Sequence, residues 1–126
     1  MSSRAVLLVE DDPDVREDLA YLLQQKGYSV DTAENGREAL QRIQETGAPC
    51  IVILDLMMPV MDGWEFRAAM LKEPALREVP VVLVSGVADL TQDARLLKAA
   101  DYLTKPVNLK RLYALVEQYC PLNAST

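Results

Sequence analysis

The sequence predicts a single α/β domain with a doubly wound, five-stranded parallel sheet and five helices. Short apolar runs alternate strictly with longer segments whose apolar residues recur at helical spacing, which is typical of βαβ units. Three of the apolar runs contain almost no polar residue, as expected for strands that are buried on both faces of a parallel sheet. A chain of 126 residues, half of them hydrophobic, is also the right size for one compact domain with a hydrophobic core.

The first half of the chain contains three predicted strands and two predicted helices. In chain order these are a strand over Ala5–Val9, a helix over Asp14–Lys26, a strand over Ser29–Ala33, a helix that is capped by Asn35 and reaches about Glu45, and a strand over Cys50–Leu54. The first helix has a clear beginning, because Asp12 suits the N-cap and Pro13 suits the first helical position. Gly27 and Gly47 end the two helices, since glycine readily adopts the left-handed conformation that often follows a helix.

The second half of the chain continues the same alternation. Its predicted elements are a helix from Asp62-Gly63 to about Lys72, a strand over Val81–Val84, a short helix around Gln92–Lys98, a strand over Asp101–Thr104 and a final helix that is capped by Asn108. The final helix has an apolar stripe at the spacing of one helical face, formed by Leu109, Leu112, Leu115, Val116 and Tyr119.

The hydrophobicity of the five strands predicts their order in the sheet. The first, third and fourth strands are the most apolar and should lie in the centre, whereas the second and fifth should form the edges. With right-handed crossovers this gives the order 2-1-3-4-5, the flavodoxin-like arrangement. Ligands of such sheets bind at the carboxyl ends of the strands where the order reverses, which here lies between the first and third strands.

Acidic residues follow the first and third strands at this point. Glu10, Asp11 and Asp12 come directly after the first strand, and Asp55 comes directly after the third. Asp12 is adequately explained as the N-cap of the following helix, and an aspartate after a strand is often only a turn former. The two clusters together favour a metal site, because carboxylates that converge must bind a cation or share protons.

Two further polar residues follow the remaining central and edge strands. Ser85 follows the fourth strand and Lys105, before Pro106, follows the fifth. Each alone would be an ordinary helix-entry or surface residue. Because all carboxyl ends meet at one edge of a parallel sheet, we expect the serine hydroxyl and the lysine ammonium to lie near the acids.

Charge and hydropathy exclude several classes of protein. The net charge of −6 disfavours direct binding to nucleic acid. The longest apolar runs are far too short to span a membrane, and the residues after Met1 do not form a signal-peptide pattern. We therefore expect a cytoplasmic protein.

The chain contains no histidine and two cysteines. Without histidine it can form neither a histidine-rich zinc site nor a Ser-His-Asp triad, and it cannot be a histidine-phosphorylated carrier. Cys50 and Cys120 lack the spacing of metal ligands, and we predict that both are buried, reduced thiols.

Four motifs, in this order and at these separations, make the chain resemble the receiver domain of bacterial two-component response regulators over nearly its whole length. They are Leu8-Val9-Glu10-Asp11-Asp12-Pro13-Asp14, Leu54-Asp55-Leu56-Met57-Met58-Pro59 with Met61-Asp62-Gly63, Val84-Ser85-Gly86, and Tyr102-Leu103-Thr104-Lys105-Pro106. The resemblance implies one receiver domain over 1–126, with a core of about 4–120 and a short polar tail over 121–126.

The resemblance also implies a role for each matching residue. Asp55 matches the phosphoacceptor, and the metal ligands for Mg²⁺ or Mn²⁺ match Asp11, Asp55 and the Met57 backbone carbonyl, with Glu10 acting through a water. Ser85 and Lys105 match the hydroxyl and ammonium that contact the phosphoryl group, and Ser85 with Tyr102 matches the switch pair. The Lys105–Pro106 bond is expected to be cis. Apolar Met57 and Val87, next to the site, are predicted to shield an acyl phosphate from water.

The implied function is phosphoryl acceptance in a two-component or phosphorelay pathway, and not enzymatic turnover of a separate substrate. The implied partners are a histidine kinase or histidine phosphotransfer protein, and then either a downstream protein or an effector beyond residue 126. A phosphorylation-independent interaction module is the alternative. An aspartate-nucleophile phosphatase is disfavoured by Met57, where a second acid is needed, and a flavodoxin by the acids that follow the first strand. Only 17 residues separate Ser85 from Tyr102 (102 − 85), which predicts a shortened fourth helix or preceding loop.

Overall fold

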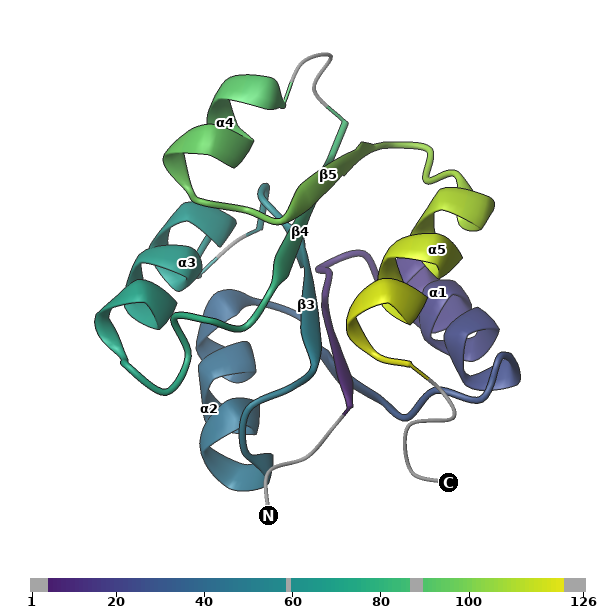
Figure 1. The fold of residues 1–126 in the computed structure, drawn as a ribbon, viewed down its shortest axis with the longest axis horizontal. Coiled ribbons are helices and arrows are strands. Elements are labelled where there is room, and N and C mark those ends of the chain that lie inside the picture. The colour runs from purple at the N-terminus through teal and green to yellow at the C-terminus, as the bar shows by residue number, and fades with distance from the viewer. Residues whose placement is uncertain (1–4, 59, 87–89, 122–126) are drawn as a thin grey trace.

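The computed structural model describes residues 5–58, 60–86 and 90–121, which form one parallel sheet between two layers of helices (Figure 1). The elements in chain order are β1 (Val6–Val9), α1 (Pro13–Gln25), β2 (Val30–Ala33), α2 (Gly36–Thr46), β3 (Ile51–Asp55), α3 (Gly63–Lys72), β4 (Val81–Ser85), α4 (Thr91–Leu96), β5 (Asp101–Thr104) and α5 (Leu109–Tyr119). The predicted alternation of strands and helices is confirmed. The predicted core boundary at residue 4 lies outside the described residues, as do residues 122–126 of the predicted tail over 121–126.

The sheet has the order β2-β1-β3-β4-β5, as the hydrophobicity of the strands predicted. All neighbouring strands are parallel, and their registers bring the carboxyl ends together. Val9 pairs with Leu54, Asp55 with Val84, and Ser85 with Thr104. The residues that end β3, β4 and β5 therefore lie side by side at one edge of the sheet.

Two hydrophobic cores lie on opposite faces of this sheet. Helices α2, α3 and α4 cover one face, and α1 and α5 cover the other (Figure 1). The alternation of side chains along each strand feeds both cores: Leu7 and Leu54 point to the first, and Leu8 and Ile53 to the second. β1, β3 and β4 are buried on both faces, which explains why their sequences are continuously apolar.

Side-chain caps define where four of the helices begin. Asp12, Asn35 and Asn108 each accept a hydrogen bond from a backbone N–H of the first turn of the helix that follows. Asp62 forms a capping box with Glu65 at the start of α3. α4 differs, because its N-cap residue is Leu90, which offers no capping side chain.

Some boundaries differ from the sequence prediction by one or two residues. β3 includes Asp55, so the phosphoacceptor candidate is the last residue of the strand and not the first of the loop. α4 is only six residues long, in agreement with the shortening predicted for this region. Leu109, assigned to the apolar stripe of the final helix, is partly exposed, because it lies in the first turn beyond the reach of the core.

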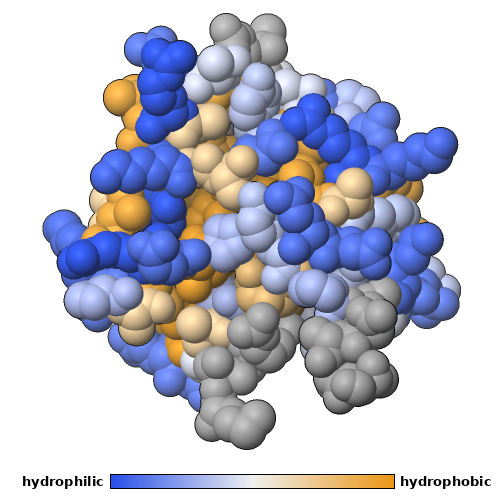
Figure 2. Space-filling model, viewed as in Figure 1, coloured by the Kyte–Doolittle hydropathy of each residue, from blue (hydrophilic) through white to orange (hydrophobic). Residues whose placement is uncertain are grey.

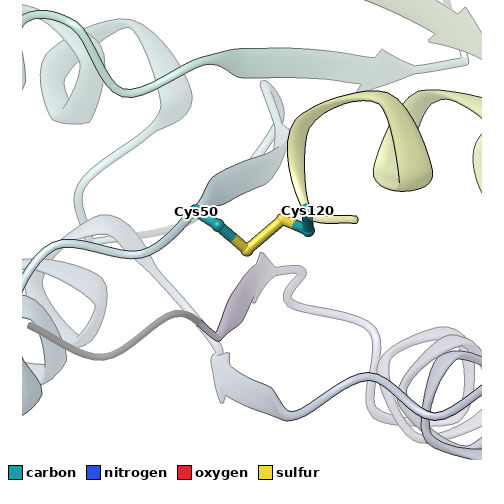
Figure 3. Close-up of a disulfide and its surroundings, with 2 residues drawn as sticks. All are labelled: Cys50 and Cys120. Atoms are coloured by element: carbon teal, nitrogen blue, oxygen red, sulfur yellow. A yellow bond between two sulfur atoms is a disulfide. The ribbon is translucent and has the colours of Figure 1, made fainter. Parts of the chain in front are cut away.

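The prediction that Cys50 and Cys120 are reduced thiols is wrong. Both are buried, but they form a disulfide, with Cα atoms 5.7 Å apart (Figure 3). Cys50 directly precedes β3, and Cys120 is the C-cap of α5. α5 runs back along the sheet, so its end returns to the amino edge of β3 although 70 residues separate the two cysteines in sequence.

Polar and apolar side chains are mixed on the surface. In the view of Figure 2, hydrophilic side chains cover most of the outer helix faces, with hydrophobic areas between them. The large hydrophobic side chains that are exposed among the described residues are Tyr21, Met57, Val60, Trp64, Leu96 and Leu109. None of the described helices is both long and apolar enough to cross a membrane.

Candidate functional site

Three carboxylates meet at the carboxyl edge of the sheet. Glu10 follows β1 and Asp55 ends β3, and both are almost fully buried, whereas Asp11 is more open to solvent. One carboxylate oxygen from each of the three lies within 4.8 Å of the others. The pairing of β1 with β3 produces this cluster, because it places the two strand ends next to each other.

Lys105 provides the positive charge of the cluster. Its Nζ lies 3.0 Å from Glu10 Oε1 and 3.1 Å from Asp55 Oδ2. The lysine follows β5, two strands away from Asp55, and its backbone N–H donates to the Ser85 carbonyl at 2.9 Å. The Lys105–Pro106 peptide bond is cis. Two of the three carboxylates, Glu10 and Asp55, thus share a single ammonium group, and the cluster keeps a net negative charge.

The protonation of two of these groups is shifted by their surroundings. Burial raises the pKa of Glu10 to about 7, a rise that the hydrogen bond from Lys105 opposes and the nearby Asp55 reinforces. Burial lowers the pKa of Lys105, but its bonds to Glu10 and Asp55 outweigh this and raise it above the ordinary value. The ammonium therefore stays charged, while Glu10 readily exchanges a proton near neutral pH.

Backbone groups hold the carboxylates in place. The Met57 N–H donates to Asp55 Oδ1 at 3.0 Å, and the Asp12 N–H donates to Glu10 Oε2 at 3.1 Å. Arg16, from the first turns of α1, donates to the Glu10 carbonyl at 2.9 Å and to the Asp11 carbonyl at 3.4 Å. Arg16 was not predicted to be part of the site, although its position one helical turn after the acids could have indicated it.

The loop after Asp55 is packed tightly against two helices. A Cβ atom on Gly63 would lie 2.7 Å from Leu56 Cα, and one on Gly36 would lie 2.9 Å from the Met61 carbonyl oxygen. The N–H of each glycine donates to the same loop, Gly63 to Leu56 and Gly36 to Met61. Any larger residue at either position would displace the loop that carries Met57.

Ser85 lies on β4 and Tyr102 on β5, the two strands that follow β3, which carries Asp55, in the order of the sheet. Ser85 is the last residue of β4 and is buried. β4 pairs directly with β3, which ends at Asp55. Tyr102, on β5, is half-buried, and its hydroxyl lies 3.1 Å from the Thr91 hydroxyl of α4. The Tyr102 hydroxyl is therefore connected to α4. Val87, predicted to lie beside the site, is outside the described residues.

This arrangement suits a hard divalent cation. Mg²⁺ prefers oxygen ligands, keeps several of its waters and is held by one or two carboxylates. The cluster offers carboxylate oxygens on one partly open side, and Lys105 balances part of their charge on the other. An anionic group that carries its own oxygens could complete such a site.

The comparisons with known proteins agree with this geometry. Residues 6–117 match the model of the response regulator receiver domain. Response regulator RR06 of Streptococcus pneumoniae is 35% identical over 121 residues, which are 90% of this chain and 54% of that protein, so this chain spans just over half of its length.

Solved structures give the same result. Chemotaxis protein CheY4 of Vibrio cholerae has a TM-score of 0.83 and 31% identity, covering 93% of this chain and 99% of that chain. Response regulator TrrA of Thermotoga maritima, solved in complex with Mg²⁺ and BeF, has a TM-score of 0.80 and 32% identity, with coverage of 93% and 99%.

Proposed function

The chain belongs to the response regulator receiver domain family, a family of signalling modules rather than classical enzymes, and from this premise we propose that it accepts a phosphoryl group on Asp55. The observation that carries this proposal is the buried Asp55 carboxylate between two further acids and a lysine at the carboxyl edge of the sheet. The donor is a phosphohistidine on a histidine kinase or histidine phosphotransfer protein, or a small acyl phosphate.

In the proposed reaction an Asp55 oxygen attacks the phosphorus atom. The bond from phosphorus to the donor imidazole breaks, its electron pair leaves with the imidazole, and an acyl phosphate remains on Asp55. Lys105, already 3.1 Å from Asp55 Oδ2, is placed to balance the negative charge of the incoming phosphoryl oxygens. The Met57 N–H keeps the carboxylate oriented during the attack.

The proposed cofactor is Mg²⁺, or Mn²⁺ in its place. Asp11, Asp55 and the Met57 carbonyl would hold it directly, and Glu10 would act through a water. The ion would supply charge neutralisation for the transferring phosphoryl group. The three convergent carboxylates support this assignment, as does the complex of TrrA with Mg²⁺ and BeF.

The proposed output is a change of the surface that contains Tyr102. Ser85 would turn its hydroxyl towards the new phosphoryl oxygens, and Tyr102 would rotate into the space that it leaves. The hydrogen bond from Tyr102 to Thr91 would break or shift as a consequence. A partner that binds the α4–β5–α5 face would then distinguish the two states.

The wider context is proposed on the same basis. We assign residues 1–126 to one receiver domain that acts in the cytoplasm within a two-component or phosphorelay pathway. Its output partner is a downstream protein or an effector joined to the chain. The Cys50–Cys120 disulfide is unusual for a cytoplasmic protein, because the cytosol keeps most thiols reduced.

A single experiment tests the phosphorylation. The protein is incubated with a small acyl phosphate and Mg²⁺, and its intact mass is measured over time. We expect a gain of one phosphoryl group that requires Mg²⁺ and is absent in Asp55→Asn. Asp62→Asn is the matched control, because it changes an acid of the same loop while asparagine retains the N-cap function.

Two outcomes would contradict the proposal. Phosphorylation of Asp55→Asn would place the acceptor elsewhere. Absence of any mass gain in the wild-type protein, with a reactive receiver as positive control and a histidine kinase as second donor, would favour a phosphorylation-independent interaction module. Trp64, the one tryptophan of the chain, lines the hollow beside Met57, so its fluorescence reports Mg²⁺ binding separately.

A further inference from the structure

Arg67 is a buried cation that the proposed phosphorylation chemistry does not use. It lies in the second turn of α3 and is only 3% exposed. Its Nε donates to the Leu97 carbonyl at 2.9 Å, and its Nη2 donates to the Lys98 carbonyl at 3.1 Å. Both acceptors belong to the end of α4, about 30 residues later in the chain.

None of the described acidic side chains pairs with the charge of Arg67. No described carboxylate lies within ion-pair distance of its guanidinium, and the third contact of the group is Met70 Sδ at 4.0 Å. Burying an unpaired charge is unfavourable, and an apolar side chain of similar volume is often more stable in such a place. An apolar residue could not replace Arg67 in one respect, because only the planar guanidinium donates to two successive carbonyls.

The end of α4 needs such a contact. α4 has six residues, none of them buried, and lacks a capping side chain at its start. At its end, Lys98 has a φ of 54°, a left-handed conformation that is unfavourable for a residue with a side chain. The guanidinium fixes the carbonyl of this strained residue, while Leu90 and Leu97 anchor the two ends of the helix in the core.

α4 also holds the hydroxyl partner of Tyr102. Thr91, the first residue of α4, lies 3.1 Å from the Tyr102 hydroxyl. α4 has only six residues and is about 9 Å long, so its two ends are closely linked through the helix. Displacing its end would therefore displace Thr91. Arg67 itself lies one turn beyond the loop that follows Asp55, so α3 connects this loop to α4.

We propose that Arg67 is a positioning residue that fixes α4 through the Leu97 and Lys98 carbonyls and thereby sets how strongly Thr91 holds Tyr102. The switching role of Tyr102 rests on the proposed function, whereas the positioning of α4 does not. Through the Arg67 guanidinium, α3 would connect the phosphoacceptor loop to the Tyr102 surface. This connection would act in addition to the one through Ser85.

The test compares Arg67→Met and Arg67→Lys with the wild-type protein in the absence of any phosphodonor. Arg77→Met is the matched control, because Arg77 is an exposed arginine whose Nε donates to the Leu71 carbonyl and not to the end of α4. Backbone hydrogen exchange is followed by mass spectrometry over 90–104, with α1 as internal reference. Fluorotyrosine NMR, assigned with Tyr102→Phe, reports the environment of the Tyr102 hydroxyl.

We expect exchange over 90–100 to accelerate by at least about tenfold in Arg67→Met, because the variant loses both hydrogen bonds to the end of α4, with α1 unchanged. The Tyr102 signal should move towards that of Thr91→Val. Arg67→Lys should lie between Arg67→Met and the wild type, because an ammonium cannot bind both carbonyls as the fork does. Arg77→Met should leave both readouts unchanged.

Unchanged exchange over 90–100, or an unchanged Tyr102 signal, in a folded Arg67 variant would overturn the inference. If Arg67→Met does not fold, the same criteria apply to Arg67→Lys. Phosphoryl occupancy of Asp55 is then measured by intact mass in the same variants. Failure of the wild-type protein to accept a phosphoryl group would contradict the proposed function and leave the positioning of α4 established by the exchange data.

Discussion

At the carboxyl edge of the sheet, Glu10 and Asp55 share the ammonium of Lys105 at 3.0 and 3.1 Å, whereas at the amino edge Cys50 and Cys120 are joined covalently. The first edge is charged, partly open and able to bind an ion. The second is buried and held by a covalent bond. The same strand, β3, connects them, because Cys50 precedes it and Asp55 ends it.

This difference shows where the fold gains and loses stability. Burial of the Glu10 carboxylate at the carboxyl edge, reinforced by the nearby Asp55, disfavours its charged form, as the raised pKa of Glu10 indicates. The crosslink at the amino edge favours the folded state without restricting the site at the other end of the strand. In this chain, the edge that carries the buried carboxylates therefore lies opposite the edge that is fixed by a covalent bond.

Removing the Cys50–Cys120 disulfide at the amino edge should have the largest effect on stability. A disulfide that closes a loop of about 70 residues contributes roughly 4 kcal/mol by restricting the unfolded chain. We expect the double variant Cys50→Ala/Cys120→Ala, and the reduced wild-type protein, to lose a free energy of unfolding of this order in urea denaturation. The rate of Asp55 phosphorylation should remain unchanged, because the crosslink lies at the opposite edge from the site.

The double variant supplies its own control, since a dithiol reductant should not alter its denaturation curve. Equal midpoints for oxidised and reduced wild-type protein would contradict the stabilising role of the crosslink. A large fall in phosphorylation rate would show instead that the two edges are coupled through β3.

Removing the Lys105 ammonium from the carboxyl edge should have the next largest effect. It should lower the phosphorylation rate and raise the affinity for Mg²⁺. In Lys105→Met the phosphorylation rate should fall about 100-fold, because the charge that stabilises the transferring phosphoryl group is lost. Affinity for Mg²⁺ should rise, because the ammonium no longer competes for Glu10 and Asp55. Intact mass gives the rate, and Trp64 fluorescence gives the affinity.

Lys110→Met, at the exposed start of α5, is the control for the change in net charge. If Lys105→Met weakened Mg²⁺ binding, the ammonium would have to organise the acids rather than compete for them. An unchanged rate would remove Lys105 from the proposed chemistry.

The two edges were not equally predictable from the sequence. The order of the strands and the convergence of Asp11, Asp55 and Lys105 followed from local patterns, because every carboxyl end of a parallel sheet lies at the same edge. The pairing of Cys50 with Cys120 depends on the path of α5 back along the sheet, which no local pattern contains. The rarity of cytosolic disulfides also favoured the wrong answer.

Arg67 was missed for a different reason. An arginine on a helix is usually exposed, so its residue type predicted a surface position although its spacing predicted a buried one. Its spacing of four from Gly63 and three from Met70 places it on the buried face of α3, and this signal was present in the sequence. Its acceptors at the end of α4 could not be predicted, since they depend on how two separate helices pack.

The charge of Glu10 should make the stability of the metal-free protein depend on pH. Because the folded protein raises the pKa of Glu10 from 4.5 to about 7, it binds this proton more tightly than the unfolded chain does. The stabilising contribution is complete below pH 4.5 and is lost as pH rises to about 7. We expect the midpoint of thermal unfolding to fall by a few degrees over this range.

Glu10→Gln should remove this part of the pH dependence, whereas Glu17→Gln, an exposed acid of α1, should not. Thermal unfolding is measured with a chelator present, at several pH values. A pH profile of Glu10→Gln identical to that of the wild type would show that Glu10 is not the titrating group.

The smallest effect is expected at the open side of the carboxyl edge. The Met57 side chain is 64% exposed, and it lines a hollow of about 320 Å³ together with Asp62 and Trp64. If this side chain limits the access of water to an acyl phosphate on Asp55, Met57→Gln should accelerate phosphate release a few-fold, because glutamine has similar length but binds water. The effect is modest because so much of the side chain already faces solvent.

Loss of phosphoryl mass after removal of the donor gives the rate. Leu96→Gln, an exposed apolar position on α4, is the control, and an unchanged rate in Met57→Gln and in the double variant with Val87→Gln would refute the shielding role.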